Sequence, residues 1–406
     1  MENRQNRILF IAEAVTLAHV ARVFTLANSL DRNTYEILIA CDPRYKNLFS
    51  SYNIPTKSIY TISSNSFSTA LEKGTPIYKT TTLEKYVTED LKLIDDFKPD
   101  VVVGDFRISL AISATKSQIP YITLTNAYWS PFAEINYPVP DIPITKIFGA
   151  KIAQTMFDIV RPFVFSLHTK PLNKVFKKFG LPDLGSDLRN TYTWANHVIY
   201  ADLPEMVSMK TLPSNHHFIG PVLWSPSIPL PKWWDELNTE KPIIYLNLGS
   251  SGKKSIIPQV LDWLSELDAN IVCATASDNA LQTDHNNVFI SSYLPGDKVC
   301  ERAAVVICNG GSPTTYQALS KGVPILGIPH NLDQFLNMQG ILKFNAGLQL
   351  RTNQIKRTLI QSSITALLDN HIYREQAIKL KKEVEHWDSS THFQRLIDKI
   401  IKSSVV

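Results

Sequence analysis

One glycine-rich segment in the second half of the chain has the residue types and order of an anion-binding turn. The apolar run at residues 305–307 predicts a buried strand, and Gly310 and Gly311 follow it. Ser312 is expected to cap a helix that begins at Pro313. The free N–H groups and partial positive charge of a helix N-terminus favour a phosphate there. An ordinary strand–turn–helix connection has the same spacing, so the turn alone leaves both interpretations open.

A histidine in the first half of the chain has the placement of a general base. His19 follows the apolar run 8–11, a predicted strand, and lies in the first turn of a helix that Thr16 could cap. A helix N-terminus disfavours a protonated imidazole, and a general base must be neutral. Because α/β proteins gather their sites beyond the carboxyl ends of strands, the position favours function over a packed or surface histidine.

An aspartate has the corresponding position after another predicted strand. Asp105 follows the apolar run 101–103 through Gly104. The structural alternative is a turn aspartate, because Gly-Asp is a common turn pair and Arg107 is near enough in sequence to hold the carboxylate. A carboxylate beside His19 would stabilise the imidazolium that forms when the base takes a proton.

The elements that must position these residues alternate between strands and helices in two series. Such alternation predicts parallel sheets with helices on both faces. The predicted strands are residues 8–11, 35–40, 101–103 and 121–124 in the first series, and 243–248, 271–274, 288–290, 305–307 and 324–328 in the second. The predicted helices are 17–30, 82–97, 108–116 and 256–267, with a final amphipathic helix at 360–401 that contains breaks.

A segment rich in proline and tryptophan separates the two series. It predicts four parts: a first domain at 1–220, a linker at 221–241, a second domain at 242–380 and a terminal helix at 381–406. The dinucleotide fingerprint Gly-x-Gly-x-x-Gly is missing, which disfavours a dehydrogenase.

The glycine-rich segment and the two short motifs after it resemble a known signature. Residues 309–318, then Gly322-Val323-Pro324, then Asp333-Gln334 are similar to the C-terminal motif of the nucleotide-sugar glycosyltransferase family that includes plant and macrolide enzymes. That motif reads His-Gly-Gly-x-Gly-Thr-x-x-Glu-Ala, then Gly-x-Pro, then Asp-Gln. The resemblance extends over most of the chain. Three positions depart from it: Asn309 replaces His, Pro313 replaces Gly or Asn, and Gln317 replaces Glu.

The resemblance implies two Rossmann-like domains facing a cleft, the glycosyltransferase B type, with a C-terminal helix that crosses back onto the first domain. It implies an inverting enzyme that moves a hexose-type sugar from a UDP or dTDP donor to an acceptor hydroxyl. His19 would be the base and Asp105 its partner. No cofactor and no metal ion is expected, and no Asp-x-Asp pair follows a predicted strand.

The resemblance also implies a donor site in the second domain. Serines would contact the phosphates, a tyrosine would stack on the base, and the Asp-Gln pair would bind the sugar hydroxyls. These residues are Ser250, Ser251, Tyr293, Asn309, Gly310, Gly311, Ser312, Thr314, Gln317, Asp333 and Gln334. The changes at Asn309 and Gln317 have two explanations: a donor such as a deoxyribose nucleotide sugar, or impaired catalysis.

The acceptor is expected to be an apolar small molecule or a lipid. Residues 127–179 are rich in aromatic side chains, and in the family this region lines the acceptor pocket. Tyr128, Trp129 and Phe132 are the acceptor-binding candidates, although aromatic residues also pack domains. Seven lysines and arginines with a single acid, Asp158, lie between Lys146 and Lys178. This pattern predicts peripheral contact with an anionic membrane surface.

Composition limits the other classes of function. A net charge of +4 is too small to indicate nucleic-acid binding by itself. The four cysteines have neither paired nor zinc-type spacing and fit a reducing cytosol, so we expect a cytoplasmic protein, peripheral to the inner face of the membrane if it binds lipid. Two alternatives stay open. One is a non-catalytic sugar-nucleotide binding protein, which Asn309 and Gln317 would suit. The other is a nucleotide-sugar epimerase, whose several sugar-facing carboxylates are not evident.

Overall fold

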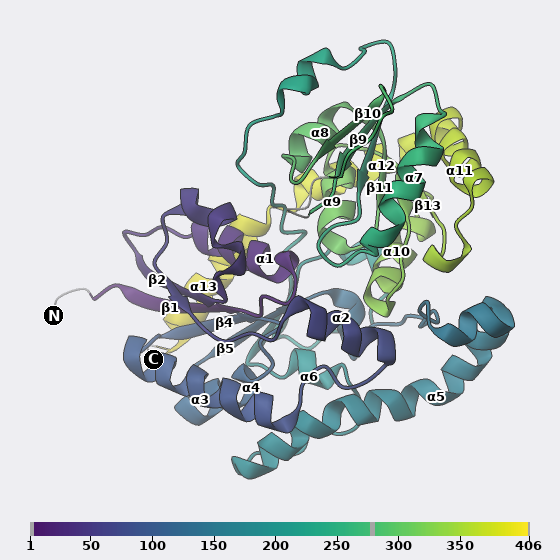
Figure 1. The fold of residues 1–406 in the computed structure, drawn as a ribbon. Helices are drawn as coiled ribbons and strands as arrows, with labels where there is room; N and C mark the ends of the chain where they lie inside the picture. The colour runs from purple at the N-terminus through teal and green to yellow at the C-terminus, as the bar shows by residue number, and fades with distance from the viewer. Residues whose placement is uncertain (1–3, 277–280, 405–406) are drawn as a thin grey trace. The chain divides into compact units, whose positions relative to one another are not determined.

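The computed structural model describes residues 4–276 and 281–404, which form two compact units (Figure 1). The first unit comprises Met1–Ile135, Thr155–Val222 and Trp387–Val406, and the second comprises Asn136–Gln154 and Leu223–His386. The segment Asn136–Gln154, part of the predicted first domain, packs with the second unit. There Arg351 donates to the carbonyl oxygen of Val139 and, at 3.0 Å, to the carboxylate of Asp141.

The first unit is built on a seven-stranded parallel sheet with the order β3-β2-β1-β4-β5-β6-β7. The chain order reverses between β1 and β4, which makes that pair the switch point of the sheet. The strands are β1 (Asn6–Ala12), β2 (Tyr35–Cys41), β3 (Thr56–Ser58), β4 (Val101–Asp105), β5 (Tyr121–Thr125), β6 (His197–Tyr200) and β7 (His216–Phe218). The helices are α1 (Leu17–Asn28), α2 (Ser64–Lys73), α3 (Thr80–Phe97), α4 (Leu110–Ser117), α6 (Asn190–Thr193) and α13 (Ser389–Ser404). Helix α5 (Pro143–Lys178) begins in the second unit and belongs to the first unit from Thr155 on.

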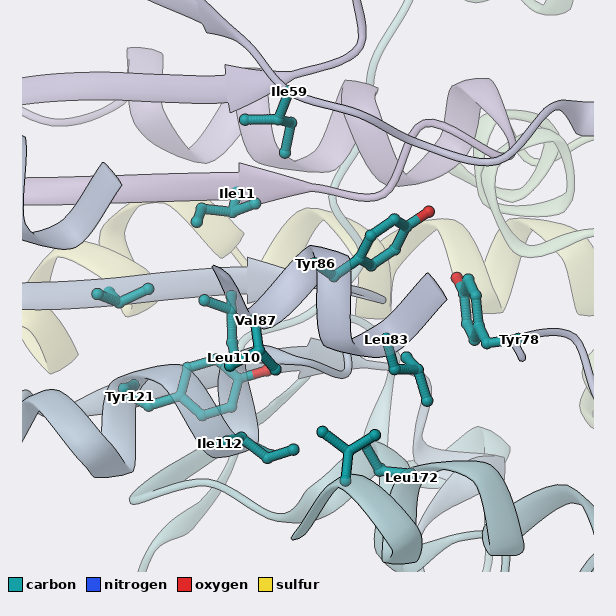
Figure 2. Close-up of a cluster of buried hydrophobic side chains, with 14 of the residues drawn as sticks. Ile11, Ile59, Tyr78, Leu83, Tyr86, Val87, Leu110, Ile112, Tyr121 and Leu172 are labelled. Carbon is teal, nitrogen blue, oxygen red and sulfur yellow. The ribbon is translucent and has the colours of Figure 1, made fainter. Parts of the chain in front are cut away.

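Helices cover both faces of this sheet, which explains why its central strands are continuous apolar runs. Successive side chains of a strand point to opposite faces. Leu9 and Ile11 of β1 therefore belong to the core beneath α3, α4 and α5, whereas Phe10 faces the other side. Figure 2 shows part of that core, with Ile11, Ile59, Tyr78, Leu83, Tyr86, Val87, Leu110, Ile112, Tyr121 and Leu172 labelled.

The last helix, α13, packs on the first unit, as predicted. Its Phe393 ring lies 6.0 Å from the ring of Phe10, and the Tyr35 hydroxyl donates to the carboxylate of Asp398. The predicted helix at 360–401 is three helices: α11 (Arg357–Asp369), α12 (His371–His386) and α13. Only the third belongs to the first unit.

The second unit is built on a six-stranded parallel sheet with the order β10-β9-β8-β11-β12-β13. Its switch point lies between β8 and β11. The strands are β8 (Ile243–Asn247), β9 (Asn270–Ala274), β10 (Val288–Ser291), β11 (Ala303–Cys308), β12 (Ile325–Gly327) and β13 (Gly347–Gln349). Its other helices are α7 (Ile257–Ser265), α8 (Gly296–Arg302), α9 (Ser312–Ser320) and α10 (Leu332–Lys343).

In the second sheet too, alternate residues of a strand face the same core. Ile244 and Leu246 of β8 pack with apolar residues of α7 and α11, and α12 packs against α9. The predicted two-domain architecture of parallel α/β sheets is therefore confirmed. The predicted linker starts at the boundary between the units and contains one short 3-10 helix, Lys232–Glu236, whose Trp234 is buried.

Candidate active site

The switch point of the first sheet brings His19 and Asp105 together. Asp105 is the last residue of β4 and pairs in register with Ala12, the last residue of β1. Helix α1 begins five residues after Ala12, so His19 lies in its first turn with 16% of its side chain exposed. The His19 Nδ1 atom is 2.7 Å from Oδ1 of the fully buried Asp105. Thr16 occupies the N-cap position, but its side chain makes no capping hydrogen bond.

A buried arginine holds the carboxylate in place. Arg22 donates from Nε to Oδ2 of Asp105 at 2.8 Å and from Nη2 to Oδ1 at 2.9 Å. This two-bond geometry fixes both the position and the orientation of a carboxylate. Burial by itself would lower the pKa of Arg22, but the adjacent Asp105 carboxylate outweighs it and leaves that pKa above its ordinary value.

The network continues to the next strand end. Arg22 Nη1 donates to the Asn126 side-chain oxygen at 2.9 Å, and Asn126 Nδ2 donates to the buried carboxylate of Asp202 at 3.0 Å. Asn126 follows β5 directly, just as Asp105 ends β4. Side chains from three adjacent strand ends are thus tied together beside His19, which limits the movement of its partner.

The short contact to Asp105 selects one form of the histidine. A carboxylate only accepts hydrogen bonds, so His19 Nδ1 carries the proton and Nε2 is left as an acceptor. Arg22 Nη2 lies 3.2 Å from the same Nδ1. The arrangement therefore suits a neutral imidazole that takes a proton at Nε2.

A row of aromatic rings extends from the histidine. Phe106 stacks on His19 with ring centroids 4.8 Å apart and an angle of 6° between the planes. Tyr192 stacks on Phe106 at 5.6 Å, and Trp129 meets Tyr192 edge-on at 5.4 Å. Phe106 has a φ of 59°, which is uncommon for a residue other than glycine. The backbone turn after β4 thus directs this ring against His19 while Asp105 supports the imidazole from its Nδ1 side.

A small cavity of about 20 Å³ lies next to Phe106, with space for roughly one water molecule. Its lining is apolar and aromatic on most sides. The residues are Ile77, Tyr78, Leu83, Phe106, Ile108, His168, Pro171, Leu172, Leu188, Thr191 and Tyr192. A larger ligand at this place requires its walls to move apart.

The three acceptor-binding candidates have different surroundings. Trp129 is half-buried and belongs to the aromatic row beside His19. Tyr128 is only 2% exposed, so its ring is part of the packed interior. Phe132 packs edge-on against His216 at 5.3 Å, and no ring contact joins it to that row among the described residues.

The switch point of the second sheet brings the predicted phosphate-contacting segments together. Cys308 at the end of β11 pairs in register with Asn247 at the end of β8. Beyond these ends, Asn309 Nδ2 donates to the Ser251 hydroxyl at 3.2 Å, and Asn309 Oδ1 accepts from the Gly311 N–H at 2.9 Å. Asn309 therefore links the two loops. Ser250 and Ser251 are both half-buried.

Helix α9 begins one residue earlier than expected. Gly311, in an extended conformation, is the N-cap, and Ser312 is already the first helical residue. The predicted cap at Ser312 is therefore wrong, because the backbone has turned into the helix by that residue. Ser312 and Thr314 lie in the first turn of α9. Anion binding at this turn stays a prediction.

Gly310 shows why the turn needs glycine. Its φ is 77°, and a Cβ atom there would lie 2.6 Å from Cγ of Met338. Asn337 Nδ2 donates to the Gly310 carbonyl oxygen at 2.8 Å and to the Thr315 hydroxyl at 2.9 Å. Helix α10 thus supports the turn from behind.

The Asp-Gln pair lies in the first turn of α10, which Asn331 caps. Asp333 is half-buried, whereas Gln334 is 1% exposed and already bonded within the protein. Its Oε1 accepts from the His330 N–H at 3.0 Å, and its Nε2 donates to the Ser251 carbonyl oxygen at 3.3 Å. Gln334 therefore connects the loop before α10 with the loop that contains Ser251.

The two remaining donor-site candidates are Gln317, within α9, and Tyr293, between β10 and α8. Gln317 is 9% exposed, and its Nε2 donates to the carbonyl oxygen of Trp224. A Cβ atom added to Gly296 would lie 2.7 Å from Oε1 of Gln317, so the start of α8 packs closely on this amide. Tyr293 is half-buried between β10 and α8.

Comparison with known proteins identifies the family. Residues 258–393 match the family model "Erythromycin biosynthesis protein CIII-like, C-terminal domain". A "PGL/p-HBAD biosynthesis rhamnosyltransferase" of Mycobacterium bovis (strain BCG / Pasteur 1173P2) is 45% identical over 377 residues, 93% of this chain and 84% of that protein. The chain belongs to the EryCIII-like glycosyltransferase family.

Two further similarities bear on this glycosyltransferase. An "Inactive PGL/p-HBAD biosynthesis glycosyltransferase" of the same organism is 46% identical over 261 residues, which is 64% of this chain and 71% of that protein. The spinosyn rhamnosyltransferase SpnG complexed with thymidine diphosphate has the same fold, with a TM-score of 0.66 and 17% identity over 97% of this chain and 100% of SpnG.

Several residues that support the site were not among the predicted ones. Arg22 is three residues after His19 and therefore on the same helix face, which is a usable sequence signal. Asn126 directly follows β5, and Asp105 is the last residue of β4. Phe106 and Tyr192 gave no such signal, because their stacking depends on a left-handed backbone turn and on a distant segment.

Proposed function

We propose that this glycosyltransferase moves a hexose-type sugar, of the deoxyhexose class, from a thymidine or uridine diphosphate to a hydroxyl group of an apolar acceptor. The observation that carries the proposal is the 2.7 Å contact between His19 Nδ1 and Asp105 Oδ1 at the switch point of the first sheet. It leaves Nε2 as the base in a partly accessible position.

The proposed reaction is a single displacement with inversion. His19 Nε2 takes the proton of the acceptor hydroxyl, and the acceptor oxygen forms a bond to the anomeric carbon. The bond from that carbon to the diphosphate breaks, and its electron pair leaves with the nucleoside diphosphate. Asp105 stabilises the imidazolium, while Arg22 holds Asp105 in register.

The second unit would hold the donor. First-turn N–H groups of α9 and the hydroxyls of Ser251 and Thr314 are suited to the diphosphate, whose negative charge grows as it leaves. We propose that this turn, rather than a divalent cation, stabilises the leaving group. Asp333 would bind sugar hydroxyls, and Tyr293 would stack on the base.

Two observations favour a thymidine nucleotide. Gln317 offers an amide where the family motif has a carboxylate, so the site lacks a double acceptor for two ribose hydroxyls. SpnG, which shares the fold, binds thymidine diphosphate, and the Mycobacterium relative is named a rhamnosyltransferase. We therefore place a thymidine diphosphate deoxyhexose first and the uridine analogue second.

The acceptor would bind along the aromatic row in the first unit. Phe106, Tyr192 and Trp129 provide ring faces that begin at His19, which suits a flat or apolar alcohol. The two Mycobacterium relatives are named for PGL/p-HBAD biosynthesis, and we propose an acceptor of comparable kind here, an aromatic or lipid alcohol.

A second candidate function is sugar-nucleotide binding without transfer. It is favoured by the relative that is named inactive and by the replacement of His and Glu with Asn309 and Gln317. The intact His19–Asp105 pair with its arginine support favours an enzyme, because a binding protein has no need of a supported base.

A donor and acceptor panel tests the proposal. UDP-glucose, dTDP-glucose and dTDP-rhamnose would be incubated with phenols carrying alkyl chains of increasing length, and products followed by mass spectrometry. The anomeric configuration of the product, read by NMR coupling constants, should be opposite to that of the donor. Retained configuration would contradict the single displacement. Tight dTDP binding with neither transfer nor donor hydrolysis would support the second candidate.

A further inference from the structure

Helix α5 exposes an apolar face of unusual size. Met156, Ile159, Val160, Phe163 and Leu167 are 41%, 66%, 49%, 70% and 47% exposed. Their spacing of three and four residues places them on one side of the helix. The other side is the inner one, where Leu172, Val175 and Phe176 are buried in the core of the first unit. An exposed stripe of large side chains usually marks an interaction surface.

The same outer side becomes basic toward the end of the helix. Lys170, Lys174, Lys177 and Lys178 continue the series from Leu167 at helical spacing, and all four are exposed. Asp158 is the single acid within residues 155–178, and it falls on the opposite side, 3.8 Å from Arg161. Lys178 pairs with Glu84 at 3.0 Å. The outer side therefore combines bulky apolar groups with an excess of positive charge from the other lysines.

We propose that α5 lies on the surface of an anionic lipid bilayer, with its apolar stripe inserted at the level of the headgroups and its lysines against lipid phosphates. The positive charge of this surface distinguishes between its possible binding partners. A second copy of this chain would bring lysines against lysines, whereas an anionic bilayer supplies both the apolar phase and the opposite charge. Among the described residues, no helix is long and apolar enough to cross a membrane, so the contact is one of surface insertion.

Helix α5 also borders the proposed acceptor region. His168, Pro171 and Leu172, on its inner side, line the small cavity that also includes Phe106, the ring stacked on His19. The helix that meets the lipid thus forms a wall of the proposed acceptor region. This part of the inference rests on the proposed function: a lipid-borne acceptor would reach His19 from the membrane rather than through water.

Vesicle flotation tests the contact without donor or acceptor. The full chain would be mixed with vesicles of phosphatidylcholine alone or with about a third phosphatidylglycerol, at low and high salt. Binding is expected only with the anionic lipid and should weaken as salt rises. Changing Lys170, Lys174 and Lys177 together to Gln should weaken it roughly a hundredfold, from about a factor of five per lysine. Ile159→Glu with Phe163→Glu should abolish it.

Matched controls lie on α12, where the same changes should have no effect. Ile372, at 52% exposed, would be changed to Glu, and the exposed Lys379 and Lys382 to Gln. Equal flotation of the α5 and α12 variants, or no flotation of the wild type, would overturn the proposal. So would a dimer in solution that Phe163→Glu dissociates. Because flotation needs no catalysis, failure here leaves the proposed transfer reaction to its own test.

Discussion

Arg22 binds both carboxylate oxygens of Asp105, at 2.8 and 2.9 Å, while its Nη2 lies 3.2 Å from the Nδ1 of His19. The partner of the proposed base is therefore itself one half of a buried ion pair. The arginine orients the carboxylate that contacts the imidazole.

Arg22→Met should lower kcat with little change in KM for the donor, because the proposed donor residues belong to the other unit. Arg22→Lys should restore part of kcat, but one ammonium cannot form both bonds. An Arg22→Met variant that folds, binds the donor normally and keeps full kcat would contradict this role. Arg4→Met, which breaks the exposed pair with Asp100, is the control.

Gln317→Glu should raise the preference for uridine over thymidine donors. A carboxylate accepts from both ribose hydroxyls, whereas the amide offers one acceptor and one donor. A preference of the wild type for uridine above roughly a hundredfold, about 2.7 kcal/mol, would contradict the relaxed choice expected of Gln317. The specificity constants of the two nucleotides carrying the same sugar give the answer, and an unchanged ratio in the variant would refute this role. The variant should also lose stability, because the Trp224 carbonyl loses its donor.

Gly310→Ala should weaken thymidine diphosphate binding by about tenfold or more. The new Cβ would lie 2.6 Å from Met338 Cγ and would disfavour the φ of 77°, so the turn before α9 must shift. Gly180→Ala is the control for an alanine at a left-handed position away from this turn, because Gly180 has a φ of 71° and a Cβ added there would meet no atom within 4 Å. Calorimetric titration should show normal affinity for Gly180→Ala. Equal affinity of both variants would argue against a phosphate site at this turn.

Stability should fall as the pH rises from about 4.5 to about 7 because of Glu13, and should level off above that range. Burial raises the pKa of this fully buried carboxyl to about 7, although Arg107 at 3.1 Å and the Tyr86 hydroxyl at 2.7 Å act in the other direction. Asp90 is also buried and accepts a hydrogen bond from Arg107, and burial raises its pKa as well. The folded protein holds a proton that the unfolded chain, with the ordinary value of 4.5, has released.

Urea unfolding at pH 5.5 and pH 8 measures this difference. The free energy of unfolding should be about 2 kcal/mol lower at pH 8, and Glu13→Gln should flatten the dependence. Glu36→Gln, at an exposed ion pair with Arg7, should leave the slope as it is. A wild-type stability that is constant or rises over this range would contradict the assignment.

The sequence was sufficient for the architecture because buried parallel strands are apolar on both faces. The runs at 8–11 and 305–307 marked β1 and β11, which extend a few residues beyond them. The position of His19 and Asp105 followed from the same rule, since both come after strands that prove to be neighbours. Residue type alone placed the N-cap of α9 at Ser312. The backbone is already helical at that residue, and Gly311 is the N-cap.

The packing around the candidate residues could not be predicted from the sequence. Gln334 looked like a sugar ligand, but it is 1% exposed and bonded to two loops. The bonds of Arg22 and the stacking of Phe106 depend on segments about 80 residues apart, which no local pattern records. Such contacts decide which of several suitable side chains can act.

The most direct test of the account is the transfer rate of His19→Ala measured beside its affinity for thymidine diphosphate. The account predicts a rate lower by roughly 10²–10⁴, as expected for a lost general base, with nucleotide affinity unchanged because the proposed donor residues belong to the other unit. Near-normal turnover of this variant on the acceptor identified in the panel would contradict the assignment of His19 as the base.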